Sequence, residues 1–426
     1  MRRVWRWLAL ALSCAGLAGA QPAPATPAVP ADGSAITVYL MTIGPGEAVW
    51  ELFGHNAIWV QDRATGLDAA FNWGTFDFDQ PNFLGRFLTG DTEYWVQPVD
   101  GPTMVSVYMA ANRSVWLQEL ALTPAQRVQM RDYLLWNARP ENMYYRYDYY
   151  RDNCSTRVRD ALDRALGGTL ERALGGVPTS TTYRSHTRRL TADNAAVYTG
   201  IQLALGRPAD APITAWEEGF LPTRLMEHVR TVSVTGADGT ARPLVAAERV
   251  LFTATREPEP SRAPDYLVAF LLAGVVLGVL LVVLARAAST SALAAFTFTL
   301  LAATWTLLAG LLGTALILAG TVTRHVYMGH NVNVAVANPV HLVLFVLVLA
   351  LFLTRRSERR AARATRATWM AALVVVLALA GAVAMSVESL DQASWEIFAL
   401  ALPVHLALLG ALALIARTQH GSARDA

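Results

Sequence analysis

The stretch YYRYDYYRDNCSTRVRDALDRALGG, residues 144–168, places a cysteine where a helix is expected to begin. Apolar side chains recur at positions 158, 162 and 166, a spacing that predicts a helix from Cys154 to the Gly-Gly pair at its end. Asp152 is a suitable N-cap, so we expect Cys154 in the first helical turn. Free main-chain N–H groups and the positive end of the helix dipole favour a thiolate there, and the same N–H groups are donors for an oxyanion.

A cysteine nucleophile needs a base to accept its proton and a third group to orient that base. His55, at the start of a predicted strand, is the best base in this part of the chain. Asn72 on the next predicted strand is the expected orienting group, with Glu51 and Asp68 as alternatives. Sequence spacing alone leaves open whether Cys154 and His55 meet.

The region around these residues has the pattern of an α+β domain, which we place at residues 34–262. A helix is expected at residues 124–138, because Thr123 is followed by Pro at the first position and by Gln126 in capping-box position. Strand patterns cover residues 36–43, 56–60, 70–74, 94–96 and 105–108.

The N-terminus has the features of an export signal. Basic residues precede an apolar run and a small-residue cleavage site, so we predict a signal peptide at residues 1–20 and a Pro/Ala-rich tether at residues 21–33. A lipoprotein signal ending at Cys14 is the alternative, but it lacks the leucine expected three residues earlier. If Cys14 leaves with the signal, Cys154 is the only cysteine of the mature chain and an intramolecular disulfide is excluded.

The second half of the chain predicts a membrane domain at residues 263–417, followed by a tail at residues 418–426. The third apolar segment is followed by six arginines between positions 355 and 366, which the positive-inside rule assigns to the cytoplasm. Counting back through three spans puts the soluble domain in the periplasm and the protein in the inner membrane. The segments long and apolar enough to span are residues 266–285, 292–319, 340–353 (starting near 335), 369–387 and 395–416.

Residues 321–338 are an outward-facing loop in this topology. One interpretation is a polar site that meets a lipid headgroup or the exported domain; the other is a solvated loop whose asparagines form turns. The polar residues concerned are His325, His330, Asn331, Asn333 and Asn338.

Several classes of function are disfavoured. The net charge of +2 is too small to indicate nucleic-acid binding, and no basic stripe alternates with aromatic residues. The sequence has no metal-binding motif, phosphate loop or internal repeat, so no cofactor and no metal are expected.

A His opening a strand, a polar residue on the next strand and a helix-opening Cys about a hundred residues later resemble the circularly permuted papain-like fold. Lecithin–retinol acyltransferase is a relative of that kind, and its Asn-Cys pair is similar to Asn153-Cys154. More specifically, the chain resembles lipoprotein N-acyltransferases of the Lnb type, which join an exported cysteine-enzyme domain to five membrane helices. The motifs that carry this are LFGH (52–55), FNWGTFDF (71–78), PNF (81–83), DNCSTR (152–157), WEEGFLP (216–222) and the segment 330–339.

The resemblance implies transfer of a fatty acyl chain from a phospholipid to the N-terminal cysteine amine of a diacylglyceryl lipoprotein. Cys154 would carry the acyl chain as a thioester, His55 would act as general base and acid, and Asn72 would orient His55. Arg157 would hold a phosphate or the helix start, or would be a plain surface arginine. The further residues expected to bind substrate or support the site are Asn153, His330 and Asn333.

Two other classes of function remain open at this point. A papain-like cysteine peptidase or amidase acting on cell-wall peptides would use the same catalytic residues. A non-catalytic envelope sensor or scaffold would need neither Cys154 nor His55.

Overall fold

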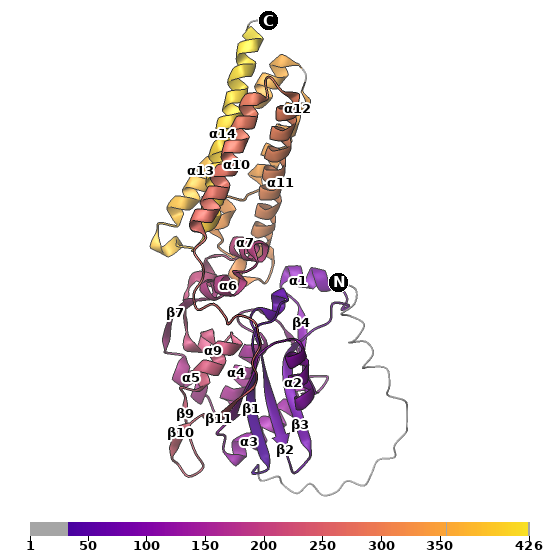
Figure 1. Ribbon diagram of the computed structural model, residues 1–426, viewed down its shortest axis with the longest axis vertical. Helices are drawn as coiled ribbons and strands as arrows, with labels where there is room; N and C mark the ends of the chain where they lie inside the picture. Colours follow the sequence, from indigo (N-terminus) through magenta and orange to yellow (C-terminus); the bar gives the residue numbers. More distant parts are fainter. Residues whose placement is uncertain (1–32, 355, 425–426) are drawn as a thin grey trace, which may run out of the picture.

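The computed structural model describes residues 33–354 and 356–424, which form a soluble α/β part and a long helical bundle (Figure 1). The predicted signal peptide, residues 1–20, and all but the last residue of the predicted tether, residues 21–33, lie outside the described residues. The α/β part comes first in the chain and the bundle follows. The predicted fold class, an α+β domain followed by an all-helical membrane region, is therefore confirmed.

A seven-stranded antiparallel sheet is the frame of the soluble part, with strand order β11-β5-β1-β2-β3-β4-β6. β1 pairs with β2 along its whole length and places Ile43 opposite His55. His55 therefore lies at one end of the central pair of strands. The strands are β1 (Ile36–Ile43), β2 (His55–Asp62), β3 (Leu67–Thr75), β4 (Glu93–Asp100), β5 (Val115–Leu120), β6 (Tyr144–Arg146) and β11 (Val245–Phe252).

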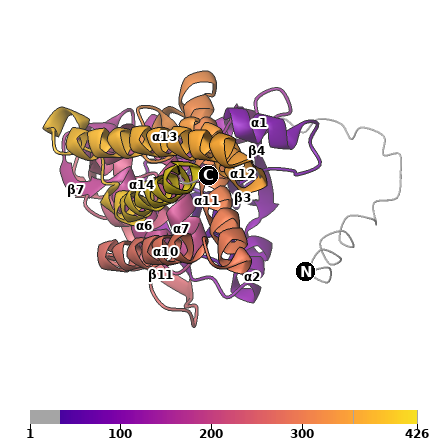
Figure 2. The same ribbon diagram turned by 90° about the horizontal axis from the view of Figure 1, so that it is seen from above.

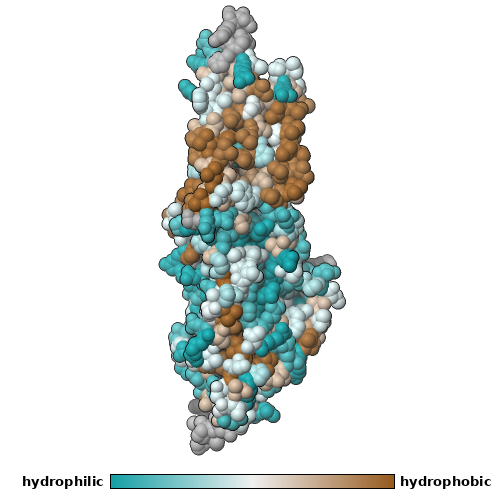
Figure 3. Space-filling view, turned by 90° about the vertical axis from the view of Figure 1, so that its left-hand side faces the viewer, coloured by the Kyte–Doolittle hydropathy of each residue, from teal (hydrophilic) through white to brown (hydrophobic). Residues whose placement is uncertain are grey.

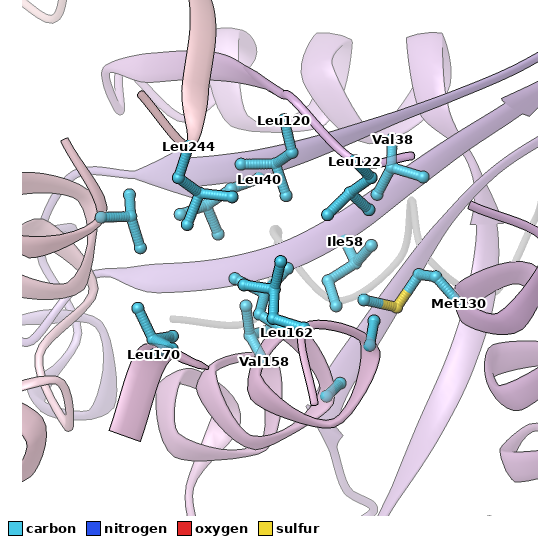
Figure 4. Close-up of a cluster of buried hydrophobic side chains, with 14 of the residues drawn as sticks. Val38, Leu40, Ile58, Leu120, Leu122, Met130, Val158, Leu162, Leu170 and Leu244 are labelled. Carbon is cyan, nitrogen blue, oxygen red and sulfur yellow. The ribbon is translucent and has the colours of Figure 1, made fainter. Parts of the chain in front are cut away.

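Both faces of this sheet are buried, because successive residues in a strand point to opposite sides. Leu40 and Ile58 belong to the core on one face, which Leu162 of α4 and residues of α3 complete (Figure 4). Met41 and Trp59 face the other way and pack with residues of α2. The helices concerned are α2 (Gly101–Ala110), α3 (Pro124–Asn137) and α4 (Cys154–Ala165). Because α4 packs on β2 and β3, its first residue lies over those strands.

Two local predictions had different outcomes. The helix start at Thr123 is confirmed: Thr123 Oγ1 accepts the N–H of Gln126, whose side chain accepts the N–H of Thr123. The strand predicted at residues 105–108 is wrong, since these residues lie in α2. Asp100 caps that helix by accepting the N–H of Thr103, and Pro102 occupies its first turn, so the start signal outweighs the alternating apolar pattern.

Shorter elements lie beside the sheet, between it and the bundle, and at the end of the sheet away from the bundle. Helix α1 (Phe83–Thr89) lies between β3 and β4 in the chain. The others are α5 (Thr169–Leu174), β7 (Pro178–Thr182), α6 (Tyr183–Thr191), α7 (Ala195–Ala204), β8 (Pro212–Thr214), α8 (Ala215–Glu218), α9 (Pro222–Val229), β9 (Ser233–Thr235) and β10 (Ala241–Pro243).

Five helices of the described residues are long and apolar enough to cross a membrane, and they form the apolar band in Figure 3. The arginine-rich segment predicted as a loop is largely helical: α13 starts at Ser357 and includes four of the six arginines. Ala and Arg are good helix formers, so the span simply extends beyond the lipid. The helices are α10 (Leu267–Ala287), α11 (Ala292–Val322), α12 (Val340–Leu353), α13 (Ser357–Ala384) and α14 (Trp395–Arg424).

The loop at residues 321–338 docks the bundle onto the soluble part. The side-chain amides of Asn331 and Asn333 donate to carbonyl groups at the C-terminal end of α7. Of the alternatives raised by the sequence, these contacts match the one in which the loop meets the exported domain.

A buried carboxylate makes a second link between the two parts. Glu396, in the first turn of α14, accepts hydrogen bonds from Arg188 Nη2 at 2.6 Å, from the hydroxyl of Tyr198 at 2.6 Å and from the N–H of Tyr266 at 3.0 Å. Its side chain is only 9% exposed. If the carboxylate were removed, little water could therefore reach these donors and accept their hydrogen bonds.

Replacing Glu396 by Ala should therefore destabilise the junction by about 1–3 kcal/mol, because Arg188 and Tyr198 lose their common acceptor. The measurement is thermal unfolding of the purified full-length protein in detergent, with exposed Glu388→Ala as the control. Equal midpoints for the two variants would contradict a structural role for Glu396.

Candidate active site

Cys154 is the first residue of α4, and its N-cap is Asn153 rather than the predicted Asp152. The side-chain oxygen of Asn153 accepts the N–H groups of Ser155 at 2.9 Å and Thr156 at 3.0 Å. Its side-chain amide donates to the carbonyls of Tyr149 and Phe220. Asn153 is the better cap because its side-chain oxygen accepts hydrogen bonds while its NH2 group donates them, whereas an ionised carboxylate can only accept. The cap thus fixes the start of the helix, and with it the cysteine.

Asp152 has a different role from the one predicted. It forms a two-fold ion pair with Arg157, in which Arg157 Nη2 lies 2.6 Å from Asp152 Oδ2 and Arg157 Nε donates to Oδ1. The guanidinium also lies over the Tyr145 ring, 4.3 Å from its centroid. These contacts favour the helix-start role among those considered for Arg157, because its charge already has a carboxylate partner.

His55 and Asn72 face each other across β2 and β3. His55 Nε2 lies 2.5 Å from Asn72 Oδ1, and because an amide oxygen only accepts, Nε2 carries the proton. The other ring nitrogen, Nδ1, is then the acceptor of the neutral ring. Asn72 is held in turn by its Nδ2, which donates to Thr75 Oγ1 at 3.5 Å.

Gly74 is the point at which the histidine and the cysteine come together. A Cβ on Gly74 would lie 3.5 Å from Cys154 Cβ and 3.8 Å from His55 Cε1. Its φ of +96° also belongs to the region that favours glycine. The missing side chain therefore leaves one small space that the two reactive groups share. Within residues 33–354 and 356–424 no hydrogen bond joins the thiol to the imidazole, so the two are adjacent but not yet engaged.

The other candidates for orienting His55 have partners elsewhere. Asp68 accepts from Trp59 Nε1 at 2.5 Å, and Glu51 pairs with Arg113 at 3.3 Å.

Two residues that were expected to bind substrate or support the site lie elsewhere. His330 is exposed, and its carbonyl accepts the N–H of Arg207. Asn333 is buried at the interdomain loop. The contacts of these residues do not extend to Cys154.

Burial sets the charge state of the reactive pair. Burial raises the pKa of Cys154 from 9.0 to about 11. The main-chain N–H groups of Asn56 and Ser155 and the charge of Arg113 act in the opposite direction and lower this pKa, but their effect is smaller. Burial also lowers the pKa of His55 from 6.5 to about 4; Arg113 adds to this effect, and the hydrogen bond that His55 donates to Asn72 opposes it. At neutral pH the resting site therefore holds a thiol and a neutral imidazole.

Arg113 is a residue of this site that sequence reasoning missed. Its side chain is 5% exposed, and its Nε donates to the carbonyl of Gly44 at 2.9 Å. The guanidinium lies 4.9 Å from the centroid of the Tyr108 ring, and its Nη2 has no hydrogen-bond partner among the described residues. No motif marked it, because only the pairing of β1 with β5 brings the segment that precedes β5 to the site.

Among the described residues no group of three or more His, Cys, Asp or Glu side chains is arranged to hold a metal ion. The groups that the described residues bring to the site are a thiol, an oriented imidazole, main-chain N–H donors and a buried cation.

Residues 28–189 match the family model of the Lnb N-terminal periplasmic domain, a range that includes His55, Asn72 and Cys154. Together with the five apolar helices that follow, the match gives the chain the architecture of Lnb-type N-acyltransferases, so the resemblance found in the motifs is confirmed. The protein is a multi-pass membrane protein with a periplasmic N-terminal domain. Neither the curated proteins nor the solved structures contain a match to this chain.

The raised thiol pKa predicts a steep pH dependence for alkylation of Cys154 by iodoacetamide. The rate should rise about tenfold per unit from roughly pH 7 to 10, because the thiolate fraction rises in that proportion below the pKa. Mass spectrometry of the Cys154 peptide from the full-length protein in detergent gives the rate. A rate that is level from about pH 6 upward would instead show a preformed thiolate–imidazolium pair.

Arg113→Gln should slow the same alkylation roughly tenfold at pH 8, since loss of the cation raises the pKa of the thiol further. Arg113→Lys keeps the charge and should recover most of the rate. If Gln and Lys variants of equal thermal stability react alike, the charge of Arg113 does not act on Cys154.

Proposed function

We propose that the protein transfers a fatty acyl chain from a phospholipid to the N-terminal amine of a diacylglyceryl-cysteine lipoprotein, by way of a thioester on Cys154. The observation that carries the proposal is the shared space over Gly74, where a helix-opening thiol meets an imidazole that Asn72 already orients. The family match supports it, because the matched domain contains all three residues.

The first half of the reaction would load the enzyme. His55 Nδ1 takes the proton of Cys154 as the sulfur attacks the ester carbonyl of the phospholipid, which becomes a tetrahedral oxyanion. The ester C–O bond then breaks, and His55 returns the proton to the departing oxygen of the lysophospholipid. The acyl chain remains on Cys154 as a thioester.

The second half would unload it. The lipoprotein amine attacks the thioester carbonyl and gives a proton to His55, the C–S bond breaks, and an amide forms. His55 then returns the proton to the sulfur and restores the thiol. The balance requires no oxidant, reductant or metal.

The site offers stabilisation for the thiolate that attacks the ester. The N–H groups of Asn56, Cys154 and Ser155 act on the sulfur and lower its pKa, so they favour its charged form, and N–H groups at a helix start are also suitable donors for an oxyanion. The charge of Arg113 acts on the sulfur as well. Because both are held by the main chain or by buried contacts, they need little rearrangement during the reaction.

The junction supports a membrane-bound substrate. Tyr149, five residues before Cys154, packs against the rings of His325 and Tyr327 in the interdomain loop, with centroids 6.0 and 6.2 Å apart. The segment that leads into the nucleophile is thereby tied to the outer end of the bundle. A donor and an acceptor anchored in the outer leaflet of the inner membrane would both meet the enzyme at that level.

The test is N-terminal acylation of a lipoprotein in cells depleted of their own N-acyltransferase, measured by mass spectrometry. The wild type should add the N-acyl chain, and Cys154→Ala should add none. His55→Ala should acylate the lipoprotein at least about a hundredfold more slowly than the wild type. His228→Gln is the matched control, because His228 pairs with Glu218 away from the site and Gln keeps that donor.

Membrane fractions must hold equal amounts of each variant. Absence of the N-acyl chain with the wild type would overturn the proposed reaction and favour hydrolysis of cell-wall peptides. Acylation by Cys154→Ala would instead remove Cys154 from the chemistry.

A further inference from the structure

An exposed apolar surface, named here the apolar rim, lies beside the site. It consists of Trp50, Phe78, Leu84, Phe87 and Leu88, which are 61, 48, 68, 54 and 61% exposed. Single exposed apolar residues are ordinary, but a cluster of this size on a soluble surface indicates a binding partner. The members form one surface: Trp50 packs against Phe78, and both Phe78 and Phe87 pack against Phe83.

The apolar rim is attached to the end of a membrane helix. The N–H of Arg324, two residues beyond the end of α11, donates to the carbonyl of Thr89 at 2.9 Å. His325 Nε2 lies 3.0 Å from the carbonyl of Phe87, and Arg324 pairs with Asp91 at 3.0 Å. Helix α1 is thereby held at the level where α11 leaves the membrane (Figure 1).

The surroundings of α1 identify lipid as the partner. Seen from above, α1 lies at the edge of the bundle and is not covered by it (Figure 2). Leu84, Phe87 and Leu88 are three and four positions apart and so share one face of the helix. Val322, at the end of α11, is 71% exposed, so the apolar rim continues the lipid-facing surface of that helix. The one charged residue of α1, Arg86, forms an ion pair with Glu93 and donates to the carbonyl of Asp91.

A row of aromatic rings leads from the apolar rim toward the nucleophile. Phe83 stacks on Phe76 at 6.1 Å between centroids, Phe76 packs on Tyr94 at 4.9 Å, and Tyr94 stacks on Tyr147 at 4.2 Å. Phe76, Tyr94 and Tyr147 are half-buried. Tyr94, Tyr147 and Cys154 all pack against the same buried core, so the inner end of the row lies near the sulfur. Burial and negative charge on Cys154 together raise the pKa of Tyr94 to about 12, which agrees with this placement.

We propose that the apolar rim inserts into the outer leaflet and that one acyl chain of a membrane phospholipid passes along the aromatic row to Cys154. The inference rests on the proposed function and specifies how its donor reaches the thiol. A short amphipathic element buried at the headgroup level fits this role, because it gains apolar contact without spanning the membrane.

Photocrosslinking of the full-length protein in phospholipid nanodiscs tests the position of the apolar rim. A benzoylphenylalanine at position 88 should give a phospholipid adduct by mass spectrometry, at least tenfold above the same residue at position 135. Leu135 is a suitable control because it is also an exposed leucine, 44% exposed, and lies on α3 at the end of the soluble part away from the bundle. Equal or absent lipid adducts at both positions would overturn the insertion.

Acyl loading tests the route. Leu84→Glu combined with Leu88→Glu should slow thioester formation on Cys154 from nanodisc phospholipid at least tenfold, while Leu135→Glu leaves it unchanged. Alkylation of Cys154 by iodoacetamide should stay within twofold in all three proteins, which shows that the site is folded and open. Normal loading of the double variant would overturn the route. A lipid adduct from the variant with benzoylphenylalanine at position 88, together with a wild type that never forms a thioester, would contradict the proposed function and leave the insertion standing.

Discussion

The capping of α4 by Asn153 is the interaction on which the rest of the site depends. One amide satisfies two N–H groups of the first turn and, at its other end, two carbonyls from separate segments, at Tyr149 and Phe220. The helix start is thereby fixed relative to the segment after β6 on one side and to the segment before α9 on the other. Ser155 extends the same link, since its hydroxyl donates to the carbonyl of Gly219 and accepts from the side chain of Asn56. The nucleophile proposed at Cys154 would therefore need little reorganisation to react.

The electrostatics of the site balance burial against a small number of fixed charges. Burial alone favours the neutral thiol and the neutral imidazole, whereas Arg113 and the main-chain N–H groups favour the thiolate. Arg113 can remain charged in that setting because Glu51, the carbonyl of Gly44 and the Tyr108 ring surround it. This balance suits an acyl carrier, because a thiol that stays protonated at rest is protected from oxidation and is activated only beside its base.

The membrane half does more than anchor the domain. Its outer loop and the first turn of α14 supply the amides and the carboxylate that bind α7 and α6, and α11 ends on α1. The soluble part is therefore held against the bundle through several contacts, and the insertion proposed above would place the apolar rim in the outer leaflet. Under the proposed function, lipid substrates would reach an enzyme fixed in this way by diffusion in two dimensions.

Local signals in the sequence were sufficient for much of this structure. The capping box at Thr123, the four-residue spacing after Cys154 and the five apolar segments could be predicted, because each depends on neighbours within a few residues or on bilayer thickness. The strand expected at residues 105–108 and the cap expected at Asp152 failed because each was decided by a competing local partner. Only the tertiary structure revealed three features of the site: the position of Arg113, the approach of His55 to Cys154 over Gly74, and the aromatic row. Each joins residues on different strands and helices, and only the register of the sheet and the packing of α4 on β2 and β3 bring them together.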